Sequence, residues 1–332
     1  MIRDARLCRV TGDGLVRVAG SDARRFLHAQ TTQRIDDLPP DATRPAAWLT
    51  AGGRVRAVFD VIPDREAFWL LVPAEMAASL AAGLRRYVLR DQVQIEQPAD
   101  SCVLAVLGDV DAWLDQHGVR LATGAVAMVD GSSGGAGSSG GVGRFGADAV
   151  VLARTGPERV TLIVPAALEP RPEPGPATES APVPAPTPEL LTGLAPASAA
   201  AAELEAIACG RAAVTAALVE RYIPQMLDLE RLGAVSFNKG CYPGQEIVAR
   251  TQNLGEVKRR LGRFRSPAGP TPAAGDAIVD SGGDDCGEVN RAAPTADGVE
   301  LLAVVKRAAD PKTLRLLSDG RALSPLALPW AE

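Results

Sequence analysis

One short segment gathers residue types that could do chemistry within a few positions of one another. From Lys239 the chain reads Lys-Gly-Cys-Tyr-Pro-Gly-Gln-Glu, which sets Cys241 between two glycines and two residues from a lysine. Gly240 and Gly244 allow the backbone to turn sharply or to approach a ligand closely. Pro243 is suited to the first turn of a helix, so we expect a helix N-terminus just after Cys241.

The surroundings of Cys241 are expected to favour its thiolate, because a helix N-terminus and a nearby lysine both stabilise that form. The thiolate could attack an electrophile, undergo reversible oxidation or contact a metal cluster. Glu246 could orient an amine of a ligand or act as a base, although helix capping would also explain a glutamate there. We predict Cys241, Lys239 and Glu246 as the catalytic residues.

A structural role is the alternative for any cysteine, because a single Cys is more often a small buried apolar residue than a reactive group. The flanks of Cys241 do not form an apolar strand or helix face, so there we place function first. Lys239 as a plain surface charge stays an alternative. The structural interpretation covers the other four cysteines, which are Cys8, Cys102, Cys209 and Cys286.

Length and composition set the class of protein. A chain of 332 residues exceeds what one hydrophobic core usually serves, so two or three domains are expected. The net charge of −5 argues against direct nucleic-acid binding through a broad basic surface. The odd number of cysteines without a CxxC pair favours a reducing cytoplasm, with no disulfide framework and no metal site. We expect neither a signal peptide nor a membrane span.

The elements that must position the cysteine segment follow a repeating α+β pattern. Residues 1–100 predict strand, helix, three strands, helix and strand, an order close to the ferredoxin-like split βαβ arrangement. A looser copy is expected in residues 101–255, which include the cysteine segment. The expected strands and helices of the two halves lie at residues 15–18, 23–30, 47–49, 55–62, 68–72, 74–89, 92–95, 103–107, 110–117, 125–129, 149–153, 160–164 and 199–209.

The end of the chain and two low-complexity tracts differ from this pattern. Residues 256–332 show short strands separated by Gly-rich turns, which predict a small C-terminal β-barrel. Residues 131–143 are rich in Gly and Ser, and residues 170–188 alternate Pro with small or acidic residues. We interpret both tracts as loops without a function of their own.

The cysteine segment resembles the signature of the YgfZ family. That signature is Lys-Gly-Cys, an aromatic residue, any residue, Gly-Gln-Glu, then Ala-Arg and a basic stretch. Residues 239–261 read KGCYPGQEIVARTQNLGEVKRRL, and residues 222–238 match the preceding family segment as well. The similarity covers most of the chain apart from the low-complexity tracts and the divergent C-terminal module.

The resemblance implies a fold shared with the aminomethyltransferase of the glycine cleavage system. In that fold two ferredoxin-like halves and a C-terminal β-barrel surround a central folate-binding hole. The resemblance also implies an accessory protein for the synthesis or repair of iron–sulfur enzymes, including a tRNA-methylthiolating enzyme, with its activity centred on Cys241. The implied cofactor is tetrahydrofolate or a derivative, with transient contact to an iron–sulfur cluster, and the implied partners are iron–sulfur enzymes or cluster-assembly proteins. The residues expected to contact the cofactor are Gly240, Tyr242, Gly244, Gln245, Arg250 and Glu205.

Two positions depart from the pattern of the folate-dependent transferases. Those enzymes carry an acidic residue shortly after a glycine turn, where this chain has Ala57 and Val58. Asp60 is a weak substitute, because strand alternation places it on the face of Val58. Ala208 stands where the superfamily has a pterin-binding glutamate, which puts folate binding in doubt. Glu205, three residues earlier on the same helix face, could compensate in part.

Two other functions stay open on the sequence. One is an aminomethyltransferase-like enzyme, although the missing carboxylates argue against glycine-cleavage activity. The other is a non-catalytic module that binds protein or RNA. A basic cluster could receive a folate's glutamate tail or an RNA phosphate, or simply be a solvated face. Its members are Arg250, Lys258, Arg259, Arg260, Arg263 and Arg265. We interpret His28 and His117 as structural or solvent-exposed.

Overall fold

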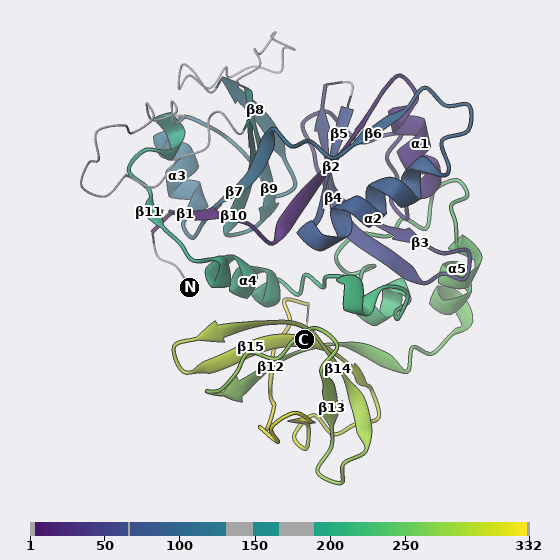
Figure 1. Ribbon diagram of the computed structural model, residues 1–332, viewed down its shortest axis with the longest axis vertical. Coiled ribbons are helices and arrows are strands. Elements are labelled where there is room, and N and C mark those ends of the chain that lie inside the picture. The colour runs from purple at the N-terminus through teal and green to yellow at the C-terminus, as the bar shows by residue number, and fades with distance from the viewer. Residues whose placement is uncertain (1–3, 66, 131–148, 166–188, 331–332) are drawn as a thin grey trace.

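The computed structural model describes residues 4–65, 67–130, 149–165 and 189–330. Both predicted low-complexity tracts, residues 131–143 and 170–188, lie outside the described residues. Figure 1 shows two sheet-based halves side by side, with a third module of β-strands packed beneath them in that view.

The first half is a five-stranded sheet of order β3-β4-β5-β2-β6, covered by two helices. The buried residues of α2, such as Met76, Leu80 and Leu84, recur at helical spacing and face the sheet. Helix α2 is shorter than predicted. At Arg86 and the two residues after it, each backbone N–H donates to the carbonyl oxygen three residues earlier, which is typical of a 3₁₀ turn. The elements are β2 Asp13–Ala19, α1 Ala23–Gln30, β3 Arg44–Leu49, β4 Val55–Asp64, β5 Ala67–Pro73, α2 Ala74–Arg85 and β6 Gln94–Glu96.

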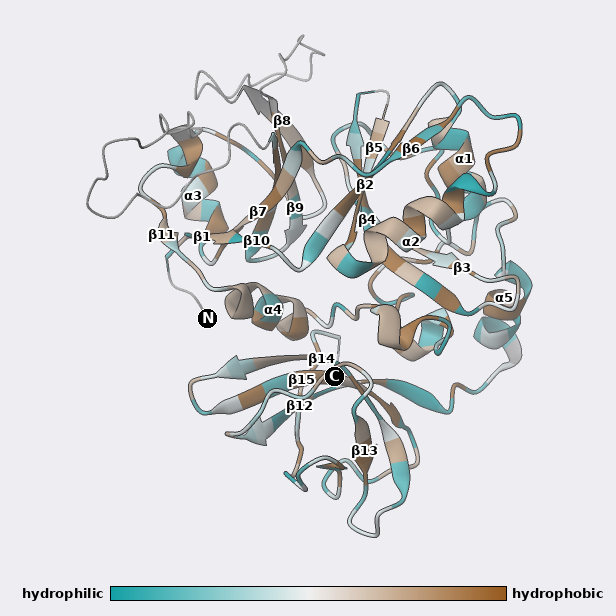
Figure 2. Ribbon diagram, in the orientation of Figure 1, coloured by the Kyte–Doolittle hydropathy of each residue, from teal (hydrophilic) through white to brown (hydrophobic). Residues whose placement is uncertain are grey.

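The second half is a six-stranded sheet of order β11-β1-β7-β10-β9-β8. Its strand β1 comes from the start of the chain and pairs antiparallel with β7, a pairing that the sequence pattern did not predict. Figure 2 shows hydrophobic residues along β7, β9 and β10, which pack against α3. The elements are β1 Arg6–Arg9, β7 Ser101–Leu107, α3 Val110–Gln116, β8 Val126–Asp130, β9 Ala149–Gly156, β10 Arg159–Pro165, a 3₁₀ turn Glu189–Leu191, β11 Ala195–Pro196 and α4 Ala199–Ala208.

A connecting segment and a third sheet complete the described chain. The third sheet runs β16-β13-β14-β15-β12-β17 and forms a half-barrel, where the sequence predicted a small β-barrel. The connecting segment holds 3₁₀ turns Ala216–Leu218 and Pro224–Leu227 and α5 Gln245–Leu254. The strands of the third sheet are β12 Arg259–Pro267, β13 Ala277–Val279, β14 Asp285–Thr295, β15 Gly298–Lys306, β16 Arg315–Leu316 and β17 Ser324–Leu326.

Shared hydrophobic cores hold the three parts together. One core joins the two halves, where Ile62 of β4 and Ile163 of β10 belong to the same buried cluster. A second core contains Leu49 of β3, Tyr222 of the connecting segment and Leu302 of β15. The three parts therefore meet at one junction, which is where the cavity described below lies.

Candidate functional site

The cysteine segment forms a turn before α5 rather than the first turn of the helix. The N–H of Gln245 donates to the carbonyl oxygen of Tyr242 at 3.2 Å, and Gly244 has φ +82°. Pro followed by Gly at the two central positions, with a positive φ at the glycine, makes a type II turn. The expectation that Pro243 opens the helix is therefore wrong. Because α5 begins at Gln245, Cys241 lies four residues before its first helical residue.

This turn packs directly against the loop between β3 and β4. A Cβ on Gly244 would lie 2.6 Å from the carbonyl oxygen of Thr50 and 2.8 Å from the Cα of Gly53. Gly53 has φ +72°, and its own Cβ would lie 2.8 Å from that of Ile247. Real side chains do not approach so closely, so backbone packing gives Gly244 a structural reason to be glycine beside its predicted ligand role.

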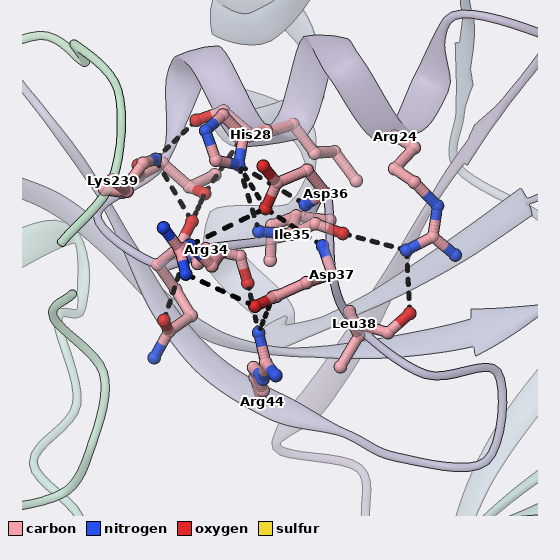
Figure 3. A network of polar contacts seen from close by, with 12 residues as sticks. Arg24, His28, Arg34, Ile35, Asp36, Asp37, Leu38, Arg44 and Lys239 are labelled. Carbon is pink, nitrogen blue, oxygen red and sulfur yellow. Dashed lines mark hydrogen bonds and ion pairs between the residues drawn. The ribbon is translucent and has the colours of Figure 1, made fainter.

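Lys239 attaches the segment to the first half of the molecule (Figure 3). Its Nζ donates to the backbone carbonyl oxygens of His28, Thr31 at 2.5 Å and Gln33 at 3.1 Å. These carbonyls lie at the C-terminal end of α1 and just beyond it, where a positive charge is favourable. All three ammonium donors thus have acceptors, so the main contacts of Lys239 are with the first half.

Burial changes the titration of two side chains in this segment. Desolvation lowers the pKa of Lys239 to about 8, against a smaller opposing effect of Asp36. Desolvation also raises the pKa of Tyr242 to about 12. The Lys239 ammonium lies 4.8 Å from the centre of the Tyr242 ring, close enough for a cation–π contact. Lys239 and Tyr242, which lie on either side of Cys241 in the sequence, are therefore fixed and partly desolvated.

Cys241 itself is exposed, whereas Cys8 and Cys286 are buried and the other two cysteines are intermediate. Glu246 and Arg250, one turn apart on α5, are exposed as well. Within the described ranges neither side chain has a hydrogen-bond or ion-pair partner. The turn and α5 thus present a thiol, a carboxylate and a guanidinium at the surface.

His28 is a neighbour of this segment that the sequence reasoning missed. Its Nδ1 accepts the N–H groups of Ile35 and Asp36, both at 3.3 Å, and its Nε2 lies 3.7 Å from the position of a Cβ on Gly240. Desolvation, with a contribution from Lys239, lowers the pKa of His28. No sequence signal could have found this neighbour, because the contact joins α1 to a segment more than two hundred residues later.

A cavity of about 440 Å³ lies at the junction of the three parts. Residues of β4, β9 and the end of α4 line it together with residues 229–234 and Trp330. None of residues 239–246 is among its lining residues. Val58 of β4 lines the cavity, whereas Gly53, in the turn before β4, touches the cysteine segment. The candidate site therefore has two parts, a surface thiol and a cavity.

Ion pairs line much of the cavity. Arg211 pairs with Asp60 at 2.5 Å, and Arg159 pairs with Asp13 at 2.7 Å. Arg154 and Arg291 also line the cavity and pair with Asp111 and Glu203. Arg231 differs, since its recorded contact is a hydrogen bond to the carbonyl oxygen of Trp330 at 3.4 Å. Among the lining arginines, Arg231 is the one without an ion pair in the part of the chain that the structure describes, although its charge opposes the desolvation that raises the pKa of Asp228.

The two carboxylates considered in the sequence analysis occupy different places. Asp60 and Val58 both line the cavity, as strand alternation predicts. The ion pair with Arg211 means that Asp60 is not a free base. Glu205 is half-buried, its Oε1 accepts from the Cys209 thiol at 3.3 Å, and its Oε2, without a hydrogen-bond partner, lies 3.9 Å from Nη1 of Arg159. Glu205 does not itself line the cavity, and its cofactor role stays a prediction.

The predicted basic cluster is largely neutralised by neighbouring acids. Arg259 pairs with Asp285, and Arg260 pairs with Asp228 and Glu230. Arg263 and Arg265 both pair with Glu300. Arg250 and Lys258 have no ion pair within the described residues, but neither lines the cavity, so a receptor for an anionic group of a cavity ligand is better sought at Arg231.

The fold is that of an aminomethyltransferase. The structure superposes on the glycine cleavage system aminomethyltransferase T from Bartonella henselae with a TM-score of 0.72 at 18% sequence identity, covering 100% of this chain and 87% of that one. This likeness establishes the fold alone. No family model matches the chain.

Curated homologues of the chain carry the name tRNA-modifying protein YgfZ, which confirms the predicted resemblance. The protein from Photobacterium profundum is 24% identical over 95% of this chain and 81% of its own length. The one from Vibrio atlanticus is 26% identical over 74% of this chain and 65% of its own length. The one from Escherichia coli O45:K1 is 34% identical, but over 38% of this chain and 40% of its own length.

No described helix has the length and apolar character needed to cross a membrane. No group of three or more His, Cys, Asp or Glu side chains suited to holding a metal ion occurs in the described ranges.

Proposed function

We propose that this protein is a folate-binding accessory factor for the synthesis or repair of iron–sulfur enzymes, including a tRNA-methylthiolating enzyme. Its working group is the thiol of Cys241. The name of its curated homologues, tRNA-modifying protein, supports the context of tRNA modification. The observation that carries the proposal is the exposure of Cys241 in a turn whose two sides are fixed by Lys239 and Gly244.

The chemistry available to Cys241 is that of an accessible sulfur ligand. A cysteine thiolate binds iron, and it does so best when the backbone around it is already ordered. The Cys241 thiolate would bind one iron atom of a client enzyme's cluster while that cluster is built or repaired. In this proposal Glu246 and Arg250 border the contact with a client protein, because both side chains are exposed beside the thiol. Gln245 and Tyr242 stay candidates for cofactor contact.

The cavity has the size and lining expected of a folate site. Ligand cavities usually measure ~300–1,000 Å³ and combine apolar walls with a few polar groups. This one is about 440 Å³ and is lined by Val58, Phe59 and Leu71 beside its ion pairs. Arg231 would receive the anionic glutamate tail. When bound, tetrahydrofolate supplies a reduced pterin that can carry a one-carbon group.

An aminomethyl-transferring enzyme is the less favoured alternative. Ala57 and Val58 offer no carboxylate, and Asp60 is held by Arg211. We also propose that both halves of the molecule have a ferredoxin-like fold. The antiparallel order β4-β5-β2-β6 supports this for the first half, with β3 as an added edge strand.

The proposal is tested in a strain that lacks its own YgfZ-type protein. The activity of iron–sulfur enzymes is measured in extracts of cells that carry this chain or an empty vector. The chain is expected to restore that activity by several-fold. Equal activity in both extracts, with the protein present and folded, would sink the proposal.

A further inference from the structure

One ion pair in the cavity wall has the geometry of a recognition group. Asp60 is 7% exposed and lines the cavity, and its Oδ2 accepts from Nη2 of Arg211 at 2.5 Å. The described residues offer no hydrogen-bond donor to its Oδ1. Oδ1 is not among the described side-chain atoms that are buried without a partner, so this oxygen is open to the cavity, where a ligand or water can supply a donor.

Arg211 is itself held in place. Its Nη1 donates to the carbonyl oxygen of Thr155, and its own carbonyl oxygen accepts from Nη1 of Arg291 at 2.9 Å. Asp60 belongs to β4 of the first sheet, whereas Arg211 follows α4 and Thr155 belongs to β9 of the second sheet. Because the pair is anchored on both halves, its orientation toward the cavity is set by the fold rather than by the ligand.

The surroundings of the pair define the kind of ligand that would bind it. Val58 and Leu71 give the neighbouring wall apolar surface. An open carboxylate oxygen accepts N–H donors, and a guanidinium donates to a carbonyl oxygen. The two together match the edge of a flat heterocycle that presents N–H groups beside a carbonyl, such as an aminopyrimidinone ring.

We propose that Asp60, held by Arg211, is the carboxylate that recognises the amino-substituted ring of the cavity's ligand. This role rests on the proposed folate function and assigns it a residue that differs from both Ala208 and Glu205. Recognition requires no bond change, since Asp60 keeps its ion pair and accepts hydrogen bonds from the ring. The role concerns affinity and ring selectivity, not group transfer.

Calorimetric titration with tetrahydrofolate tests the proposal with a matched control outside the cavity. Asp60→Asn replaces the carboxylate by an amide, and Asp285→Asn does the same at an ion pair of the third sheet, with Arg259, that does not line the cavity. Loss of a hydrogen bond to a charged acceptor weakens binding by about tenfold or more. We expect that loss for Asp60→Asn and at most about a twofold change for Asp285→Asn.

A second measurement on the unaltered chain guards against misfolding of the variant. A tetrahydrofolate analogue that lacks the ring amino group should bind the wild type about tenfold more weakly than tetrahydrofolate does. Equal affinities of wild type and a folded Asp60→Asn variant, equal losses in both variants, or equal affinities for both ligands would each overturn the role of Asp60. If the wild type binds no tetrahydrofolate at all, the folate part of the proposed function fails, and this inference fails with it.

Discussion

At the scale of single residues, Lys239 shows how the folded chain assigns a role that spacing alone does not reveal. Two residues from Cys241, it was predicted as the charge that favours the thiolate. In the structure its ammonium donates to the carbonyl oxygens of His28, Thr31 and Gln33. Its contribution to the site is therefore to hold the backbone of the cysteine segment in place.

Titration of Lys239 should appear in the stability of the protein. Burial lowers its pKa from 10.5 to about 8, so between these values the unfolded chain binds more protons than the folded one. The free energy of unfolding that Lys239 contributes must then rise with pH across this window. Urea unfolding of wild type and Lys239→Met at pH 7, 8.5 and 10 should show the wild type gaining stability relative to the variant. Parallel pH profiles would contradict this assignment.

The sequence predicted some residue-scale features well and others not at all. Cys241 was placed beside a glycine turn because its flanks are not apolar, and the structure shows that turn with an exposed thiol, while its functional role stays a prediction. The position of His28 beside Gly240 could not be predicted, since it depends on how α1 packs against a distant segment. The same holds for Asp60, whose partner Arg211 comes from beyond α4.

At the scale of elements, the contact between two turns fixes the cysteine segment. Pro243 and Gly244 are compatible with both a helix start and a type II turn, and the positive φ of Gly244 decides for the turn. Packing favours the turn over a helix start, because the backbone at Gly244 lies directly against Thr50 and Gly53. Sequence reasoning located α5 but placed its start too early for this reason.

The close packing of Gly244 can be separated from its backbone strain by a matched substitution. Gly283 has φ +89° with nothing within 4 Å of a Cβ, so Gly283→Ala adds strain alone. That strain costs ~1–2 kcal/mol. Gly244→Ala adds a clash with Thr50 and Gly53 and should cost an additional ~1–3 kcal/mol. Equal losses in the two variants, measured by urea unfolding, would show that the turns do not pack as described.

At the scale of the whole molecule, the cavity exists because three parts of the chain meet. The order in which the strands of the first half and the strands β7 to β10 follow one another along the chain can be predicted from the hydrophobic pattern and the turn residues. The pairing of β1 with β7 cannot be predicted in this way, because a four-residue strand with charged ends has too short a hydrophobic pattern to indicate a strand. The cavity, lined by parts of β4, β9 and α4 and by Pro329 and Trp330, could be predicted only through the family resemblance.

Ligand binding at such a junction should stabilise all three parts together. At a concentration of tetrahydrofolate one hundred times its dissociation constant, the gain is about 2.7 kcal/mol. We expect one cooperative thermal transition that moves to higher temperature, and slower alkylation of Cys209, which lines the cavity. Slower alkylation of Cys241 instead would place the ligand at the surface segment.

The central claim, that Cys241 carries the activity, is tested most directly by the level of methylthiolated tRNA in a strain without its own YgfZ-type protein. The strain receives the wild-type chain, Cys241→Ser, or Cys286→Ala as a variant that also removes one cysteine. We predict that wild type and Cys286→Ala restore the modified tRNA, whereas folded Cys241→Ser leaves it at the level of the empty vector. Full restoration by Cys241→Ser would contradict the account.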